Sequence, residues 1–496
     1  MTERARTHHV VERLWGALAA QDHAAPAGYR RPLIALLSAC FVLRFVLALA
    51  LPNIHQADEI YQVSEQANRV LHGYGVISWE FQTSSRPALL PTVVLPIYAL
   101  PASAAVHEAL SAALFTLFSL LPVWVAFHWA ARLYGIAGGI VAGVVAGTWF
   151  ELVYFAPKPT ADAVCAYFFA AALFLGRPSS RAGAAALAGF ALLVALGIRM
   201  QIAPAVGVVF VLILLSHDRR NRAVFVAGAA LALALVGAVE WAWWGAPFAG
   251  HWGYLKMEFS RHASGYFGRE PLSFFLKNAV LLYGAALPIV AALAVAGARR
   301  APVLLVAFAA LAIPFHVIGH KEYRFMVPAI SVLILLAGIG AAAAIAHVAP
   351  SPRRATWAAL AAGWLIAMAA MSWSDSFRPL WFKDGGHIRA FRDIGAQPDA
   401  CGIGLENIRW WHTPGYAGIG RDIPIYEMLG IDQRSALAGA ANYVIAATKS
   451  PAPPPPYQEW REYARPLEKV YRRPGACVAV PSAVVERPPV PTGIVQ

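Results

Sequence analysis

The chain has 496 residues, of which 59% are hydrophobic and only 14% are charged, and its formal net charge is +13. Soluble domains carry about a quarter charged residues on average, so this composition excludes an ordinary water-soluble globular protein. Many of the basic residues lie in short stretches between apolar runs, where they set membrane topology, and we expect no nucleic-acid partner.

Apolar runs taken in chain order predict an α-helical polytopic membrane protein with about eleven transmembrane helices. Seven runs approach or exceed the ~20 residues that span hydrocarbon. They are 32–51, 135–156, 223–244, 274–297, 302–319, 326–348 and 355–373. Less regular candidates are 106–130, 160–176, 183–198 and 200–215, and 88–104 could add a re-entrant or interfacial piece.

The loops between these runs are unequal in length. Residues 1–31 are polar and lack a signal-peptide pattern, so we expect a cytoplasmic N-terminal segment. The short arginine-bearing loops then also face the cytoplasm, as the positive-inside rule requires. Three long stretches, 52–88, 245–273 and 374–496, face outward. Such one-sided loops predict chemistry at the outer surface of a plasma or inner membrane, on a transmembrane domain spanning 32–373.

The outer stretches suggest further structure. Within 58–72, apolar residues recur at helical spacing, which predicts an amphipathic helix at the membrane interface or, alternatively, a solvated loop helix. Residues 374–481 read as a small mixed α/β domain with strands at 441–446 and 468–480, a stiff proline segment at 451–456, and a disordered tail at 482–496. Cys401 and Cys477 both fall outside, where a disulfide is possible but not established by the sequence.

An acidic pair, Asp58 and Glu59, follows the first apolar run on its outer side. A general base at the interface is one interpretation, because transfer of a sugar to an alcohol needs a carboxylate that accepts the hydroxyl proton. The alternative is a solvated acidic pair without a role.

A second charged group lies between the runs 302–319 and 326–348 and contains His320, Lys321, Glu322 and Arg324. Basic residues at a membrane edge often extend toward the headgroups, and that is the simpler reading. A phosphate-binding cluster explains in addition why an outward loop is so basic and why Glu322 lies among the cations.

Other residues are assigned to the same outer surface by the predicted topology. Arg86, Lys158, Asp162 and Arg199 could bind substrate, or each could belong to a structural ion pair. Trp79 and Tyr266 could line a sugar or isoprenoid site, or belong to an ordinary aromatic belt. The sequence has no phosphate-loop motif, zinc-ligand spacing or D-x-D motif, so we expect neither a cofactor nor a metal.

Two of these motifs together resemble a known family. The first outer loop, H-Q-A-D-E-I-Y followed by E-Q-A-N, G-Y-G and S-W-E-F, resembles the H-P-D-E…E…G-x-G…T-W-E signature of the Alg9-like, GPI-type mannosyltransferases. Arg86 and Pro87 match the element after that loop, and H-K-E-Y-R-F matches the second signature. The stretch through Gly265, Tyr266 and Pro271 matches a third. His55-Gln56-Ala57 is one residue longer than the family's His-Pro.

The resemblance implies a GT-C fold of glycosyltransferase family 22, with Asp58 as general base and Glu59 in support. His320, Lys321 and Arg324, with Arg86 and Arg199, would bind the donor phosphate, and Glu322 would orient them. The implied reaction is inverting transfer of mannose from a polyprenyl-phosphate carrier to a lipid-linked or cell-envelope glycan.

Three readings compete with mannose transfer. Another polyprenyl-phosphate sugar, such as arabinose or galactose, would suit the same fold. A lipid or sugar transporter is less favoured because the charges collect on one face, and a membrane scaffold would not require both charged motifs. The Ala-, Arg- and Pro-rich composition favours a bacterial enzyme.

Overall fold

The computed structural model describes residues 13–16, 26–178, 180–261, 263–348, 354–447, 449–463, 468–486 and 488. The chain divides into two compact units. Unit 1 comprises Met1–Phe45, Leu114–His251 and His262–Phe377, and unit 2 comprises Val46–Ala113, Trp252–Arg261 and Arg378–Gln496. The first outer stretch, 52–88, therefore belongs to the same unit as the C-terminal segment.

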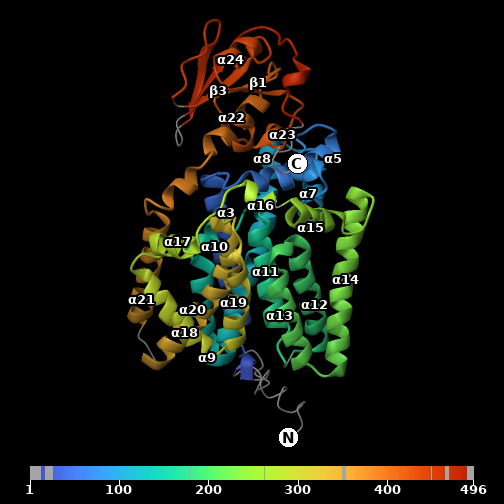
Figure 1. The fold of residues 1–496 in the computed structure, drawn as a ribbon. Helices are drawn as coiled ribbons and strands as arrows, with labels where there is room; N and C mark the ends of the chain where they lie inside the picture. Colours follow the sequence, from blue (N-terminus) through green and yellow to red (C-terminus); the bar gives the residue numbers. More distant parts are fainter. Residues whose placement is uncertain are drawn as a thin grey trace. The chain divides into compact units, whose positions relative to one another are not determined.

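Unit 1 is a bundle of apolar helices (Figure 1). Its helices, two of which continue into unit 2 at one end, are α3 (Arg30–Ala50), α8 (Ala104–Phe118), α9 (Leu120–Thr148), α10 (Phe150–Phe155), α11 (Ala161–Leu175), α12 (Ala182–Ile198), η2 (Met200–Ile202), α13 (Ala203–Ser216), α14 (Arg219–Trp244), α16 (Ala263–Tyr266), α17 (Phe274–Tyr283), α18 (Ala286–Ala298), α19 (Pro302–Val317), η3 (Tyr323–Met326), α20 (Val327–Val348) and α21 (Arg354–Ser372).

Within the described residues, four helices are long and apolar enough to cross a membrane, or five if a bent pair counts as one span. The four are Arg30–Ala50, Ala104–Thr148, Arg219–Trp244 and Tyr323–His347. Shorter apolar helices occupy other predicted runs, including Ala161–Leu175, Ala182–Ile198, Met200–Ser216, Pro302–Val317 and Thr356–Ser372. The expected helical membrane architecture is thus confirmed, whereas the count of eleven spans is not.

Two predicted spans differ from continuous helices. The run 274–297 folds as α17 and α18, which are bent by 108° at a break where Gly284 adopts a φ of 48°. Glycine tolerates this left-handed conformation, which explains why the helix ends there. Helix α9 leaves helical conformation at Tyr134 and Gly135, where the sequence predicts a short loop, and the chain breaks again before α10 at Trp149.

Small residues let helices of unit 1 approach closely. A Cβ atom added to Gly189 of α12 would lie 2.0 Å from the Phe225 carbonyl oxygen of α14. An added Cβ on Gly340 of α20 would lie 1.9 Å from the Leu293 carbonyl oxygen of α18. Membrane helices pack without a strong hydrophobic drive, so contacts between backbones at small residues matter for their association.

Arg44, the charge that interrupts the first apolar run, is 1% exposed inside unit 1. Its guanidinium donates to the Ser119 hydroxyl and carbonyl, both at 2.7 Å, and to the carbonyls of Ala146 and Gly147. These bonds join α3 to both ends of α9 and satisfy a cation that hydrocarbon would not tolerate.

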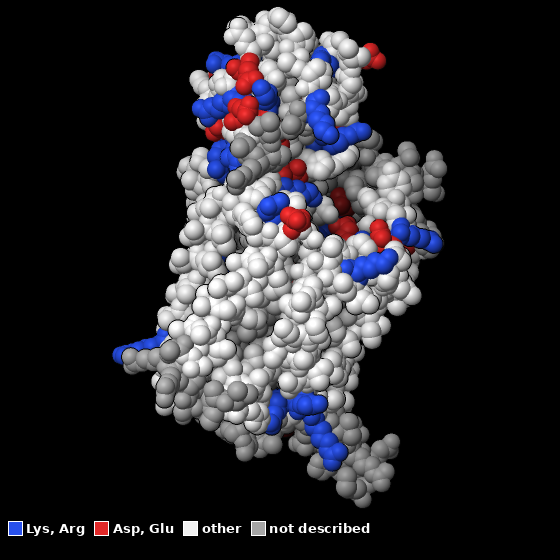
Figure 2. All heavy atoms as spheres, turned by 90° about the vertical axis from the view of Figure 1, so that its left-hand side faces the viewer, with Lys and Arg blue, Asp and Glu red and all other residues white. Residues whose placement is uncertain are grey.

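The outer flank of the bundle is apolar. In Figure 2, the broad lower part of the face in view is nearly free of charged side chains, and Lys and Arg residues gather at its lower end. Large exposed hydrophobic residues of unit 1 include Leu276, Ile289, Ile313 and Ile366. Such a surface suits contact with lipid tails.

Unit 2 combines short helices with a sheet. Its elements are α4 (Ala57–Glu59), η1 (Ile60–Ser64), α5 (Glu65–His72), α6 (Trp79–Gln82), α7 (Leu89–Tyr98), most of α15 (Ala249–Arg261), η4 (Arg378–Phe382), α22 (Gly385–Gly395), β1 (Ile403–Glu406), η5 (Trp410–His412), α23 (Gly415–Ile419), β2 (Ile425–Met428), α24 (Ile431–Leu437), β3 (Tyr443–Ala447), β4 (Gln458–Tyr463), β5 (Glu468–Arg472) and η6 (Pro481–Ala483).

The five strands have the order β2-β1-β3-β5-β4. Strand β1 pairs in parallel with β2, Ile403 opposite Ile425, and with β3, Ile403 opposite Tyr443. Strand β5 is antiparallel to both β3 and β4. The small mixed α/β domain predicted for the C-terminal segment is confirmed in this sheet. The strand predicted at 468–480 ends at Arg472, close to Pro474, which cannot donate to a ladder.

The two faces of the sheet carry different cores. Helix α22 packs through Phe391 and Ile394 on the face that bears Leu405, and Tyr61 and Val76 of the first outer stretch join this core. Helix α24 packs through Leu437 against the opposite face. The first outer stretch is therefore part of the hydrophobic core of unit 2.

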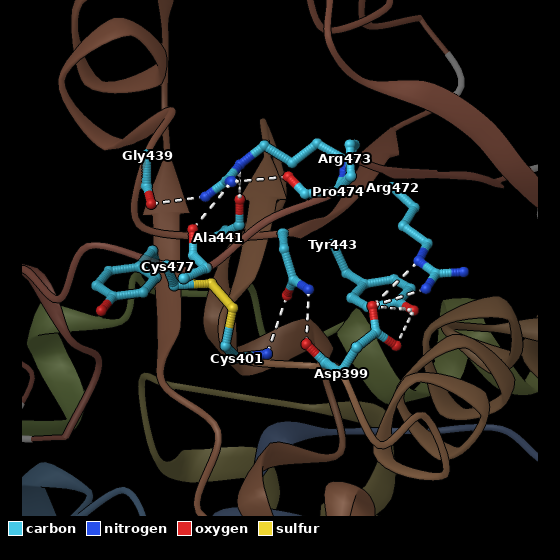
Figure 3. The surroundings of a disulfide bond; sticks show 12 residues. Asp399, Cys401, Gly439, Ala441, Tyr443, Arg472, Arg473, Pro474 and Cys477 are labelled. Carbon is cyan, nitrogen blue, oxygen red and sulfur yellow. Dashed lines mark hydrogen bonds and ion pairs between the residues drawn. A yellow bond between two sulfur atoms is a disulfide. The ribbon is translucent and has the colours of Figure 1, made fainter.

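Cys401, which lies just before β1, forms a disulfide with Cys477 (Figure 3). Asn442 orients the nearby turn, since its amide accepts from the Cys401 N–H at 2.9 Å and donates to the Asp399 carbonyl at 2.8 Å. Part of the predicted tail is ordered: Val485 is buried and its N–H donates to the Ile425 carbonyl. Residues 487 and 489–496 lie outside the described part of the chain.

The segment 58–72, expected to form an amphipathic helix, is helical, and its predicted apolar residues Val63 and Ala67 are buried. The segment folds as α4, a π-helical turn η1 and α5, and its apolar residues Val70 and Leu71 are 50% and 40% exposed. Glu65 and Gln66 are instead fully buried. Polar side chains turn inward here because buried backbone groups of unit 2 supply their hydrogen-bond partners.

Candidate active site

Asp58 and Glu59 lie at the start of the first outer helix, yet their side chains differ in surroundings. The Glu59 carboxylate accepts hydrogen bonds from the backbone N–H groups of His55 and Gln56, the latter at 3.0 Å. These bonds form one arm of a capping box, and Glu59 is only 4% exposed. Glu59 thus fixes the backbone that carries Asp58, whose side chain remains 23% exposed.

Arg86 lies between two carboxylates. Its Nη2 atom is 3.6 Å from Oδ2 of Asp58 and 3.7 Å from Oε1 of Glu80. Glu80 also accepts a 2.8 Å hydrogen bond from the amide of Gln62. Burial raises the pKa of Glu80, Arg86 opposes that rise, and Asp58 adds to it. The structure therefore brings Asp58 and Arg86 together, and it adds Glu80 to them.

The aromatic loop contributes to the same part of unit 2. A Cβ atom added to Gly253 of α15 would lie 1.9 Å from the Ser84 carbonyl oxygen, so only glycine permits this approach. Ser84 itself has a φ of 48°. Trp79 is half-buried at the start of α6, and its carbonyl accepts from the Thr83 hydroxyl at 2.9 Å. Helix α15 thereby supports the turn that leads to Arg86.

Glu65 ties the first outer stretch to the C-terminal sheet. Its carboxylate accepts from the N–H groups of Val76 at 2.7 Å, Tyr416 at 3.2 Å and Ala417 at 2.9 Å. Burial raises the pKa of Glu65 to about 7, although the backbone N–H groups counter the rise. The side chain is fully buried, so the contact is part of the core of unit 2.

In unit 1, a buried ion pair joins two predicted site residues. Arg199 Nη2 lies 2.9 Å from Oδ1 of Asp162, and their side chains are 4% and 0% exposed. Asp162 stands in the first turn of α11, whose N-cap is Thr160, where a carboxylate is favoured by the helix dipole. Arg324 Nη1 approaches the second oxygen of Asp162 at 3.9 Å. The ring of Phe325 lies against both guanidinium groups.

Glu322 continues this chain of charges. It accepts from Nε of Arg324 at 2.8 Å and contacts Nε2 of His320 at 3.1 Å. Burial alone would raise the pKa of Glu322, but Arg324 and His320 outweigh burial and lower it well below its usual value. Glu322 thus contacts both of its basic neighbours in the cluster.

Lys321 points to a different partner. The side chain is 4% exposed, and its ammonium donates to the carbonyls of Glu270, at 2.9 Å, and Ile318. The Glu270 N–H in turn donates to the Gly319 carbonyl at 2.9 Å. The G-R-E-P stretch of the aromatic loop and the H-K-E stretch are therefore joined within unit 1.

Two further predicted residues of unit 1 lie beside aromatic rings. Tyr266 is 52% exposed and packs edge-on against Phe267, which reaches the His320 ring at 5.8 Å. The Lys158 ammonium lies 4.9 Å from the centre of the Tyr154 ring, in the turn before α11. Phe267, rather than Tyr266, makes the ring contact with the histidine of the cluster.

Sequence reasoning missed several buried acids. Glu80 belongs to the S-W-E signature, and Glu65 belongs to the helix before it, so the sequence could have pointed to both. Glu151 accepts hydrogen bonds from Trp149 Nε1 and the Tyr283 hydroxyl, both at 2.6 Å. It lies within an apolar run, and apart from its charge nothing in the sequence marks it as a site residue. Within the described residues, no group of three or more His, Cys, Asp or Glu side chains is arranged to hold a metal ion.

Comparisons with known proteins agree with this architecture. A model of the Alg9-like mannosyltransferase family matches residues 35–378. The chain is 24% identical over 400 residues to GPI mannosyltransferase 3 of Yarrowia lipolytica, covering 77% of this chain and 74% of that protein.

Solved structures show a similar fold. ArnT from Cupriavidus metallidurans aligns with a TM-score of 0.57 at 15% identity in the apo state. The same protein bound to undecaprenyl phosphate aligns at 0.55 and 14% identity, and both alignments cover 88% of this chain and 97% of ArnT. At such identities the likeness shows the fold alone, which this chain shares with ArnT.

Proposed function

The chain belongs to the Alg9-like mannosyltransferase family, and from this membership we propose a specific reaction for it. The protein is a membrane-bound glycosyltransferase. In the proposed reaction it moves mannose, with inversion, from a polyprenyl-phosphate carrier to a lipid-linked or cell-envelope glycan on the extracytoplasmic side of the membrane. The fold shared with ArnT, which has been solved with undecaprenyl phosphate bound, supports a lipid-phosphate donor.

The observation that carries the proposal is the setting of Lys321. Arg199 and Arg324 are matched by Asp162 and Glu322, so those four charges balance. Lys321 is also buried, but within the described residues its ammonium donates to two carbonyl oxygens, and no carboxylate lies within salt-bridge distance. An ammonium has three hydrogens to donate. A phosphate oxygen would accept the third and would neutralise a buried charge that otherwise costs free energy.

Asp58 supplies the other half of the proposed chemistry. Its carboxylate accepts the proton of the acceptor hydroxyl as that oxygen attacks the anomeric carbon. The bond from the anomeric carbon to the phosphate oxygen breaks, and its electron pair leaves with the polyprenyl phosphate. Attack from the face opposite the phosphate inverts the configuration. Arg86 holds Asp58 in place, and Glu59 fixes the backbone beneath it.

The leaving phosphate requires positive charge. We propose that Lys321 and Arg324 supply this charge as side-chain cations and that His320 contacts the phosphate beside them. Trp79, Tyr266 and Lys158 are proposed to line the substrates. Transfer is then expected to continue in the presence of EDTA. A loss of transfer that added Mg²⁺ or Mn²⁺ restores would contradict the proposed role of the cations.

The proposal is tested by offering a donor panel to membranes that contain the protein. Polyprenyl phosphates carrying radiolabelled mannose, arabinose or galactose are incubated with wild type and with Asp58→Asn, and Asp218→Asn serves as control because Asp218 is an exposed N-cap. We expect label from the mannose donor to reach a glycan or lipid with wild type and Asp218→Asn only. If only the arabinose or the galactose donor supports transfer, that sugar replaces mannose in the proposal. If the donor crosses the membrane without any transfer of sugar, the protein is a transporter and the proposal is wrong.

A further inference from the structure

We infer that Arg409, Trp411 and His412, in the segment that follows β1, form a stacking platform for a pyranose ring of the acceptor glycan. The inference rests on the proposed function, because it assigns an acceptor site to the same transferase. The three residues belong to unit 2, which also contains Asp58. They were not among the residues singled out by the sequence.

The segment exposes an aromatic ring between polar groups. Trp411 is 39% exposed, whereas the side chains of Arg409 and His412 are 51% and 43% exposed. The Arg409 guanidinium lies 5.4 Å from the centre of the Trp411 ring, and the His412 ring lies 6.3 Å from it. Pyranose rings present an apolar C–H face to such a ring and hydroxyl groups to donors and acceptors at its edge.

Side-chain contacts with neighbouring elements hold this segment in place. The Trp410 N–H donates to Glu427 at 2.8 Å, and Glu427 also lies 3.6 Å from Arg409. Nδ1 of His412 lies 3.1 Å from Oδ2 of Asp384, a non-glycine residue with a φ of 56°. Strained backbone of this kind persists where its surroundings hold it, and it is common at ligand sites. The platform is thus preorganised.

The same segment is tied to the helix that carries the proposed base. The Tyr61 hydroxyl donates to the Trp410 carbonyl at 2.6 Å, and the Tyr61 ring meets the Trp410 ring edge-on at 4.5 Å. Tyr61 lies three residues after Asp58, in the π-helical turn that continues α4. A sugar on Trp411 would therefore be bound by a segment in direct contact with the base-bearing element.

The position in the sheet supports a ligand site independently. Open α/β sheets bind ligands beyond the carboxyl ends of parallel strands, where neighbouring strands connect in opposite directions. Here β1 lies between its parallel neighbours β2 and β3, in the order β2-β1-β3. The chain leaves the carboxyl end of β1 at Glu406 and reaches Trp410–His412 within this connection.

The test uses the full-length protein in lipid nanodiscs, labelled with 5-fluorotryptophan. The ¹⁹F resonance of Trp411 is assigned by its loss in Trp411→Phe. Trp241, a 63% exposed tryptophan on the apolar helix α14, is assigned in the same way as a matched control. Methyl α-mannopyranoside and methyl α-galactopyranoside are titrated as probes, and sorbitol, which has no ring face, serves as the solvent control.

We expect a pyranoside to shift the Trp411 resonance with saturation, at a dissociation constant on the order of 1–10 mM for so small a ligand. Sorbitol should cause no saturable shift, and the Trp241 resonance should not respond. Arg409→Gln should weaken binding about threefold or more. The binding test needs no sugar donor. Its outcome can therefore be distinguished from a failure of the proposed transfer reaction.

Two results would overturn the inference. One is the absence of a saturable shift of the Trp411 resonance with either pyranoside. The other is broadening of that resonance by a spin-labelled lipid to the same extent as Trp241, which would assign Trp411 to membrane contact instead.

Discussion

Lys383 donates a 2.6 Å hydrogen bond from its ammonium to the carbonyl oxygen of His55, three residues before Asp58. The Ile54 N–H returns a 2.9 Å bond to the Lys383 carbonyl. The segment leading into α22 therefore fixes the backbone from which Asp58 projects, without a contact to the proposed reacting atoms. Lys383 is a positioning residue in this account.

Replacing Lys383 by Met should lower kcat about tenfold, because a hydrogen bond from a charged donor contributes about 1.5–3 kcal/mol. The KM for the polyprenyl-phosphate donor should stay within about twofold, since Lys383 is not among the proposed phosphate-binding residues. Lys449→Met, at an exposed position, is the control. Steady-state kinetics check the prediction, and a raised donor KM with unchanged kcat would refute the positioning role.

The buried pair of Asp162 and Arg199 should be needed for stability as well as for donor binding. Asp162→Asn leaves Arg199 buried beside a neutral amide, and breaking such a pair costs about 3–5 kcal/mol. We expect a lower thermal midpoint for the purified variant. The double variant Asp162→Asn, Arg199→Met should recover much of the stability while remaining inactive. If Asp162→Asn alone has the same thermal midpoint as wild type, the ion pair does not stabilise the protein.

Glu65 should make stability depend on pH. Burial raises its pKa from 4.5 to about 7, so between these values the unfolded chain has lost a proton that the folded chain keeps. Stability therefore falls as pH rises from about 4.5 to 7 and is level above that range. Glu468, whose pKa burial raises to about 8, acts with the same sign.

Thermal midpoints of wild type and Glu65→Gln between pH 4.5 and 8 check this. The variant should show a smaller fall with pH, because its residue at 65 does not titrate. It should also be less stable at low pH, since an amide offers only one oxygen to the N–H groups of Val76, Tyr416 and Ala417. If the thermal midpoints of wild type and Glu65→Gln change in parallel with pH, Glu65 is not the cause of the pH dependence of stability.

Local patterns in the sequence were sufficient for several of the apolar helices and for contacts within the charged loop. The run 302–319 became Pro302–Val317, because a continuous apolar stretch has no other stable conformation in lipid. Glu322 and Arg324 are close in sequence, so their contact follows from short-range geometry. The strand at 441–446 appears as Tyr443–Ala447 because its β-branched and aromatic residues fit a buried central strand.

Long-range partners were not predictable in the same way. Glu65 binds the N–H of Tyr416, 351 positions away, and nothing in its helical periodicity indicates that partner. The amphipathic pattern of 58–72 gave no sign that Glu65 and Gln66 are buried, although Val63 and Ala67 of the same pattern are also buried. The 108° bend at Gly284 was also hidden, since glycine is common in straight membrane helices as well.

The Cys401–Cys477 disulfide should stabilise unit 2, because it closes a loop between residues 76 positions apart. Loss of a native disulfide commonly costs about 2–5 kcal/mol. The double variant Cys401→Ser, Cys477→Ser should therefore unfold at a lower temperature than wild type. Cys40→Ser, at a free cysteine of unit 1, is the matched control. Reduction of wild type that leaves the midpoint unchanged would contradict the expected stabilisation.

The most direct test of the central claim is single-turnover transfer of radiolabelled mannose from polyprenyl-phosphate-mannose by wild type and Asp58→Asn, with donor binding measured on the same preparations. The account predicts equal donor affinity and transfer slowed by about 10²–10⁴, the contribution of a positioned general base. Transfer by Asp58→Asn at the wild-type rate would contradict the assignment of Asp58 as the base.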